Sequence, residues 1–190
     1  MKTLLVAASL AAALSAAARA DTRTIGLGDF AALARVSDVA ISPDGKEIVY
    51  VVSRVDLKEN RDPQTLTIYD LASGAQRAIS YDRRELASPA WSPDGSRIAF
   101  LADAGTGDDA KQQIFVMDMR GGDPVPVTKA PLGVQQFAWR PDGAALAYVA
   151  SDEAPNKKDI DAHRDGFVVG DQAFNDKAAP TIARIWTVAA

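Results

Sequence analysis

The chain has 190 residues, of which 47% are hydrophobic and 24% charged, a composition typical of a globular protein and not of a disordered one. The formal net charge is −4 and there is no basic stripe, so we expect no nucleic-acid partner. The absence of cysteine excludes disulfides, a cysteine-ligated zinc site and a thiol nucleophile.

The first twenty residues have the pattern of a secretory signal peptide. Lys2 forms a short basic start, residues 4–18 are apolar, and Ala18-Arg19-Ala20 is a small-residue cleavage motif before Asp21. The apolar run is about 15 residues, shorter than the roughly 20 that a membrane-spanning helix needs, which argues against the alternative of a membrane anchor. We predict an exported bacterial protein, periplasmic or secreted, with no membrane association after cleavage of residues 1–20.

Residues 21–36 are interpreted as an N-terminal segment that carries a short helix. Phe30, Leu33 and Ala34 recur at helical spacing, with Asp29 before them and Arg35 after them. This pattern predicts a two-turn helix over residues 29–36.

A hairpin motif then occurs three times. It reads Ala-Ile-Ser-Pro-Asp-Gly at residues 40–45, Ala-Trp-Ser-Pro-Asp-Gly at 90–95 and Ala-Trp-Arg-Pro-Asp-Gly at 138–143, and its glycines are 50 and 48 residues apart. Proline presets φ for a tight turn, and glycine accepts the positive φ that follows. We therefore assign a structural role in the turns, and no chemical role, to Pro43, Asp44, Gly45, Pro93, Asp94, Gly95, Pro141, Asp142 and Gly143.

The residues after each turn alternate as in a strand. The pairs Ile48 and Tyr50, Ile98 and Phe100, and Leu146 and Tyr148 are expected to form the buried face of their respective strands.

Two further strands are expected after each of the first two hairpins, at residues 65–71 and 76–79 and at residues 113–119 and 124–128. In the third repeat the next strand, 183–188, comes about 20 residues late, so residues 151–182 are interpreted as an insertion. A period near 50 residues with four strands per repeat is typical of propeller blades. The predicted blades are residues 37–82, 83–130 and 131–190.

The predicted fold is therefore all-β: a partial β-propeller of antiparallel four-stranded blades, with two complete blades and most of a third, preceded by a short helix. Three blades would leave apolar blade faces open at both ends. We therefore expect the chain to be a piece of a longer protein, and we expect contacts between propeller chains. The alternatives are a self-contained small β protein and a short propeller completed by oligomerisation.

These features resemble the prolyl oligopeptidase family of serine peptidases, in particular the exported bacterial dipeptidyl aminopeptidases and acylaminoacyl peptidases. The resemblance rests on residues 29–45, 91–95, 139–143, 164–166 and 185–188. TolB-like propellers, which use the same Trp-Ser-Pro-Asp-Gly hairpin, are the close alternative.

The resemblance implies a propeller that caps an α/β-hydrolase domain with a Ser-Asp-His triad and admits only small peptides. These 190 residues contain no Gly-x-Ser-x-Gly motif, and His163 is the only histidine. The chain is thus expected to be the N-terminal, substrate-gating propeller fragment of such a peptidase, inactive alone, with peptide substrate bound through the hydrolase domain. The alternatives are a TolB-like periplasmic protein-binding propeller without catalysis, and another propeller enzyme with a central site built by blade loops.

No catalytic, cofactor-binding or metal-binding residue is assigned. The acids near His163 do not match a calcium-loop spacing, because positions six and twelve counted from Asp159 are Arg164 and Gly170. Residues 151–182 are interpreted as a solvated loop, or as a segment that reaches over a catalytic chamber, and the charges in 58–62 and 82–85 as solvated surface. Three tryptophans are interpreted as blade-packing residues and not as a ligand-stacking set: Trp91, Trp139 and Trp186.

Overall fold

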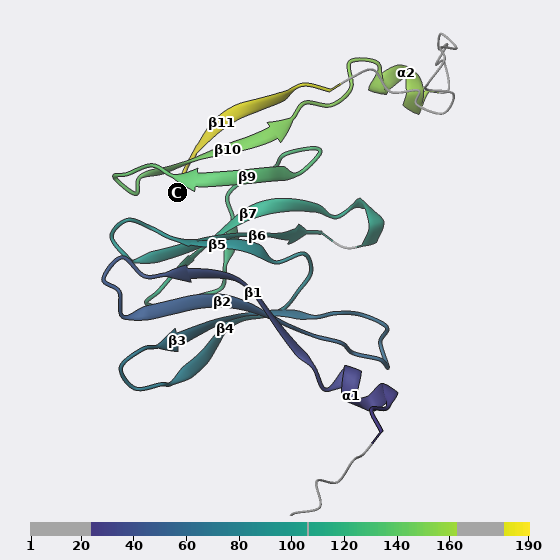
Figure 1. The fold of residues 1–190 in the computed structure, drawn as a ribbon. Coiled ribbons are helices and arrows are strands. Elements are labelled where there is room, and N and C mark those ends of the chain that lie inside the picture. The colour runs from purple at the N-terminus through teal and green to yellow at the C-terminus, as the bar shows by residue number, and fades with distance from the viewer. Residues whose placement is uncertain (1–23, 106, 163–180) are drawn as a thin grey trace, which may run out of the picture.

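Three antiparallel sheets follow one another along the molecule, as Figure 1 shows. The computed structural model describes residues 24–105, 107–162 and 181–190. The first two sheets have four strands and the third has three. The predicted fold class, a partial β-propeller, is confirmed. Within the described ranges, no helix has the length and apolar character needed to cross a membrane.

Each sheet is built from strands that are consecutive in the chain. The first contains β1 (Ala34–Ile41), β2 (Glu47–Arg54), β3 (Gln64–Asp70) and β4 (Gln76–Arg83). The second contains β5 (Ala87–Trp91), β6 (Arg97–Ala104), β7 (Lys111–Asp118) and β8 (Val125–Pro126). The third contains β9 (Val134–Trp139), β10 (Ala145–Ser151) and β11 (Ala183–Ala189). The first strands of successive blades contact one another, β1 with β5 and β5 with β9.

Three short helices complete the described elements. They are α1 (Leu27–Ala31), η1 (Gly107–Asp109) and α2 (Lys157–Asp161). The helix predicted over residues 29–36 is wrong in its extent, because Arg35 and Val36 belong to β1 and lie opposite Ser53 and Val52 of β2. Pairing with the eight-residue strand β2 satisfies the backbone N–H and C=O groups of these residues. A helix of two turns is only marginally stable by itself, so strand pairing is favoured.

The core lies between the sheets, in two clusters. Along β6, Ile98 and Phe100 face the first sheet, whereas Ala99 and Leu101 face the third. This alternation is the period of two expected of a strand that is buried on both sides. The Phe100 ring stacks on Phe115 of β7 with 5.8 Å between centroids.

The face of β2 that is buried differs from the prediction. Val49 and Val51 are fully buried, whereas Ile48 and Tyr50 are only half-buried. In the second and third sheets the face equivalent to that of Ile48 packs on the preceding sheet. Within the described residues no sheet precedes the first one, so Ile48 and Tyr50 lie on an outer face.

Two predicted segments fall outside the described residues in whole or in part. The predicted signal peptide lies in the undescribed residues 1–23, and most of the predicted insertion, including His163, lies in residues 163–180. The limits assigned to the signal peptide, the blades and the insertion stay predictions.

Candidate functional site

The three Pro-Asp-Gly turns share one backbone geometry. Gly45, Gly95 and Gly143 have φ of 71°, 72° and 70°. Each glycine N–H donates to the carbonyl three residues earlier, at 2.9, 2.8 and 2.9 Å respectively. At a positive φ of this size a side chain would clash with its own backbone, which explains the glycine at this point of each repeat.

The aspartates of these turns are held in place as acceptors. The Asp94 carboxylate accepts hydrogen bonds from the Ser92 hydroxyl at 2.6 Å and from the Ser96 hydroxyl at 2.7 Å. These hydrogen bonds hold the pKa of Asp94 well below its usual range. The Ser42 hydroxyl donates a hydrogen bond to Asp44 Oδ1 at 2.7 Å, and this bond lowers the pKa of Asp44.

In the third turn, arginine replaces the serine of the first two. Arg140 Nη2 lies 2.6 Å from Asp142 Oδ2, and the hydrogen bond from Arg140 lowers the pKa of Asp142. All three turn aspartates are therefore ionised at neutral pH and engaged in their own turns. Such carboxylates are poorly suited to general acid–base work, which needs a pKa near the working pH.

Tryptophan at the end of β5 and β9 joins each blade to the one before it. Trp91 Nε1 donates to the Ala40 carbonyl at 3.3 Å, and Trp139 Nε1 donates to the Ala90 carbonyl at 3.0 Å. The Arg97 guanidinium lies 5.2 Å from the centre of the Trp139 ring. The same contact thus recurs at both interfaces between blades.

Trp186 does not occupy the position in its sheet that Trp91 and Trp139 occupy in theirs. It lies on β11 opposite Tyr148, where the second sheet has Phe115 opposite Phe100, and it is 44% exposed. It belongs to neither core cluster, whereas Trp91 lies in the first and Trp139 packs against the second.

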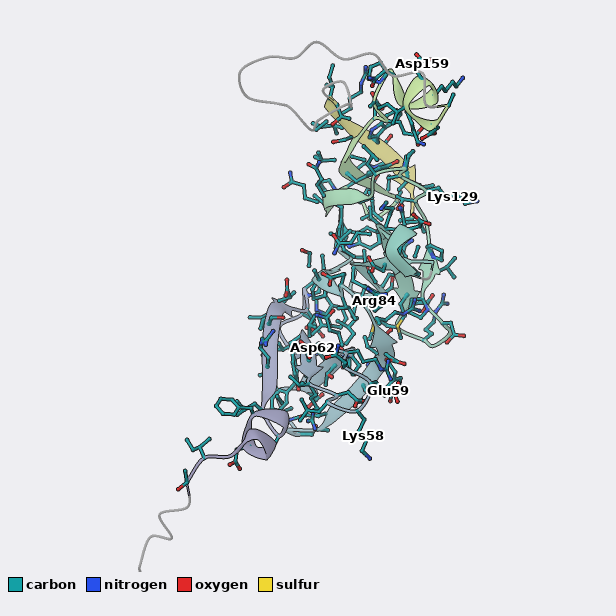
Figure 2. All side chains as sticks on the ribbon, turned by 90° about the vertical axis from the view of Figure 1, so that its right-hand side faces the viewer. Lys58, Glu59, Asp62, Arg84, Lys129 and Asp159 are labelled. Atoms are coloured by element: carbon teal, nitrogen blue, oxygen red, sulfur yellow. The ribbon has the colours of Figure 1, made fainter. Side chains whose placement is uncertain are left out.

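A polar cleft of about 650 Å³ lies at the end of the first sheet that is opposite the Pro-Asp-Gly turns. Arg61 forms an ion pair with Asp82, and Arg35 Nη1 lies 3.8 Å from Asp62 Oδ2. Figure 2 looks onto this end of the sheets and labels Asp62 and Arg84, which also line the cleft.

The sequence interpretation of residues 58–62 and 82–85 as solvated charges did not anticipate this cleft. Both runs are largely exposed, yet the β3–β4 register brings Arg61 against Asp82, 21 residues further along the chain. The alternating signs of charge were the available signal, but only the strand register could pair them.

The part of the chain that the structure describes contains no arrangement of side chains that could hold a metal ion. Across residues 24–105, 107–162 and 181–190, no three His, Cys, Asp or Glu side chains gather as a metal site would require. His163 falls outside these ranges.

Comparison with known proteins agrees with this architecture. The family model of the lipoprotein LpqB β-propeller domain matches residues 14–154. The chain is 31% identical over 129 residues to the uncharacterized peptidase YuxL of Bacillus subtilis, which covers 68% of this chain and 19% of that protein. It is 30% identical over 125 residues to dipeptidyl-peptidase 5 of Porphyromonas endodontalis, which covers 66% of this chain and 18% of that protein.

A solved structure shows the same likeness. The β-propeller domain of the Trilobed protease from Pyrococcus furiosus matches with a TM-score of 0.52 and 28% identity, over 63% of this chain and 35% of that one. The predicted resemblance to the propeller part of peptidases is confirmed. The chain spans about a fifth of the length of the curated relatives it matches, at 19% and 18%.

Proposed function

This chain belongs to the family of the lipoprotein LpqB β-propeller domain, and from that premise we propose that it is the N-terminal propeller of an exported serine-type peptidase of the prolyl oligopeptidase kind. One observation carries the proposal: two sequence relatives named as peptidases align with this chain over less than a fifth of their length. The chemistry of such a protein then belongs to a hydrolase domain outside these 190 residues, and peptides are its substrates.

In this proposal the propeller limits which peptides reach the hydrolase. The local structure supports a role without chemistry for the blades, since the turn aspartates Asp44, Asp94 and Asp142 are committed to hydrogen bonds within their turns. A serine hydrolase needs a base within hydrogen-bond reach of its nucleophile, and the 190 residues include no Gly-x-Ser-x-Gly nucleophile motif.

The surface around α1 supports a neighbouring domain. Ile25, Phe30 and Leu33 are 73%, 59% and 63% exposed and line one apolar hollow. Clustered exposed apolar side chains of this kind usually mark an interaction site. We assign this patch to contact with the hydrolase domain.

Export rests on the leader-like residues 1–20 and on the family assignment. The word lipoprotein in the description of the family model supports the same location outside the cytoplasm.

The test is to purify the native polypeptide that contains this sequence and to treat it with a fluorophosphonate, which labels activated serines. We expect labelling, and hydrolysis of aminoacyl- and acyl-peptide nitroanilides. The 190-residue chain is the matched control and should show neither. A native polypeptide that is not labelled and cleaves neither substrate class would overturn the proposal.

Gating is tested separately on the same native protein. We expect kcat/KM to fall steeply as peptide length increases while the scissile bond is kept the same. A rate independent of length would remove the gating role and leave the peptidase assignment intact.

One observation favours a second candidate, a propeller that binds other proteins without catalysis. The family model that matches most of the chain is described by a lipoprotein and not by an enzyme. In that case the native polypeptide would consist of further blades, and affinity capture would recover a protein partner in the absence of any fluorophosphonate label.

A further inference from the structure

The connection between β4 and β5, which joins the first blade to the second, is held by its backbone from both sides. The carbonyls of Arg84 and Glu85 accept hydrogen bonds from the second blade, from the Asp103 N–H at 3.0 Å and from Gln112 Nε2 at 2.9 Å. The N–H of the next residue donates to Gln64 Oε1 of the first blade. The position of this short connection is therefore fixed by groups of two blades.

The side chains of the same connection are not used by the fold. Within residues 24–105, 107–162 and 181–190, neither the Arg84 guanidinium nor the Glu85 carboxylate takes part in an ion pair or a side-chain hydrogen bond. Both side chains line the polar cleft of about 650 Å³, where Figure 2 labels Arg84. Charged side chains on a fixed backbone lose less conformational freedom when a ligand binds, which favours recognition.

Backbone strain is concentrated around this cleft. Five non-glycine residues of the described ranges have a positive φ, and three of them line the cleft: Asn60, Asp82 and Glu85, with φ of 48°, 51° and 51°. Asparagine and aspartate tolerate this left-handed region, whereas glutamate adopts it rarely. Such strain persists only where surrounding contacts impose it, and it clusters at ligand-binding sites.

Two of the three arginines in the cleft have donors available. Arg61 is engaged by Asp82. Arg35 Nη1, in contrast, lies 3.8 Å from Asp62 Oδ2, which is longer than a hydrogen bond. Arg35 and Arg84 can therefore donate to a ligand without breaking a hydrogen bond of the protein.

The charges of the lining decide which ligand fits. Arginines and carboxylates are equal in number, three of each, so the cleft has no net charge that would attract a polyanion. A guanidinium binds a single carboxylate through two parallel N–H···O hydrogen bonds. The Glu85 carboxylate repels such a ligand and so limits its affinity.

The cleft lies beside the surface that we assign to contact with the hydrolase domain. Arg35 lines the cleft and belongs to β1, which follows α1 after two residues. A peptide that reaches the hydrolase at this end of the sheets passes the cleft.

We propose that this cleft is a subsite for a carboxylate of a peptide, with Arg84 as its main donor and Arg35 as the second. The carboxylate belongs to the C-terminus or to an acidic side chain of the peptide. That the ligand is a peptide rests on the proposed function, whereas the charge and geometry of the cleft do not.

The test uses the native polypeptide that contains this sequence, treated with a fluorophosphonate so that peptides bind and are not cleaved. Saturation-transfer NMR measures the dissociation constants of two pairs of acetylated alanine peptides. One pair ends in glutamate amide or glutamine amide, and the other ends in alanine with a free carboxylate or an amide. We expect the carboxylate member of at least one pair to bind about fivefold more tightly, as for one exposed charge pair. The pair that shows this preference identifies the source of the carboxylate.

Three variants assign the preference to the cleft. Arg84→Gln should abolish it, and Glu85→Gln should increase it by about twofold, because a like charge is removed. Lys129→Gln is the matched control, since Lys129 is exposed, lies outside the cleft and is labelled at the same end of the sheets in Figure 2. It should leave the preference unchanged. Far-UV circular dichroism verifies that every variant keeps its strands.

Four outcomes would overturn the proposal: neither pair shows a carboxylate preference, Arg84→Gln keeps it, Glu85→Gln does not increase it, or Lys129→Gln lowers it as far as Arg84→Gln does. A native polypeptide that takes no fluorophosphonate label would instead refute the peptidase assignment. Binding can still be measured on that unlabelled protein, so the two failures are distinguishable.

Discussion

Replacement of Trp139 by phenylalanine should weaken the interface between the second and third blades. The change removes the hydrogen bond from Trp139 Nε1 to the Ala90 carbonyl, 3.0 Å long, whose net contribution is about 1 kcal/mol. The smaller ring also loses buried apolar surface worth about 1 kcal/mol and weakens the contact with the Arg97 guanidinium. We expect Trp139→Phe to lower the free energy of unfolding by about 2 kcal/mol.

The assay is urea unfolding followed by far-UV circular dichroism, because fluorescence would change with the loss of a tryptophan. With an m-value of about 2 kcal/mol/M, the midpoint should fall by about 1 M. Trp186→Phe is the matched control on the same sheet, since Trp186 is 44% exposed and lies in neither core cluster. Its midpoint should move by less than about 0.25 M, as for an exposed substitution.

Equal midpoint shifts for the two variants would refute the reasoning. That result would mean that the indole contact between blades stabilises the fold no more than an exposed aromatic ring does. An altered m-value would instead report that the blades unfold separately.

Two further predictions concern the turns. Gly143→Ala places a side chain at φ 70°, 3.6 Å from Pro93, and should lower the free energy of thermal unfolding by about 1 kcal/mol. Gly28→Ala is the control, because its side chain meets no atom within 4 Å, and it should lower the free energy by less than half as much. Equal melting temperatures for the two variants would contradict this. The Ser92 hydroxyl lowers the pKa of Asp94 below its ordinary 3.8, so the stability from this carboxylate is present above pH 3.8 and is lost as the pH falls through the lowered value. Asp94→Asn should therefore show a shallower loss of urea midpoint below pH 4 than the unchanged chain, and identical pH profiles would count against it.

Local turn chemistry could be predicted from the sequence because it depends on neighbouring residues. Proline and glycine in the Pro-Asp-Gly motif require one turn geometry, and the structure has φ near 71° at all three glycines, from 70° to 72°. The period of 50 and 48 residues then predicted blades, since four short strands per repeat must bury their faces against neighbours.

The extent of α1 and the buried face of β2 could not be predicted in the same way. Helical spacing at residues 30–34 is weak evidence in a segment whose end pairs with β2, and strand pairing prevailed from Ala34 onward. Both Ile48 and Val49 are large and apolar, so composition alone cannot decide which of them meets the second sheet.

For the candidate sites, the sequence by itself predicted a structural role for the three turn aspartates, because recurrence in one register marks them as parts of a repeat. Only the tertiary structure decided that Arg61 meets Asp82 and that Trp186 is more exposed than Trp91. The physical reason is range: a turn is stabilised within a few residues, whereas these contacts depend on strand register and on the stacking of sheets whose residues lie 20 to 50 positions apart.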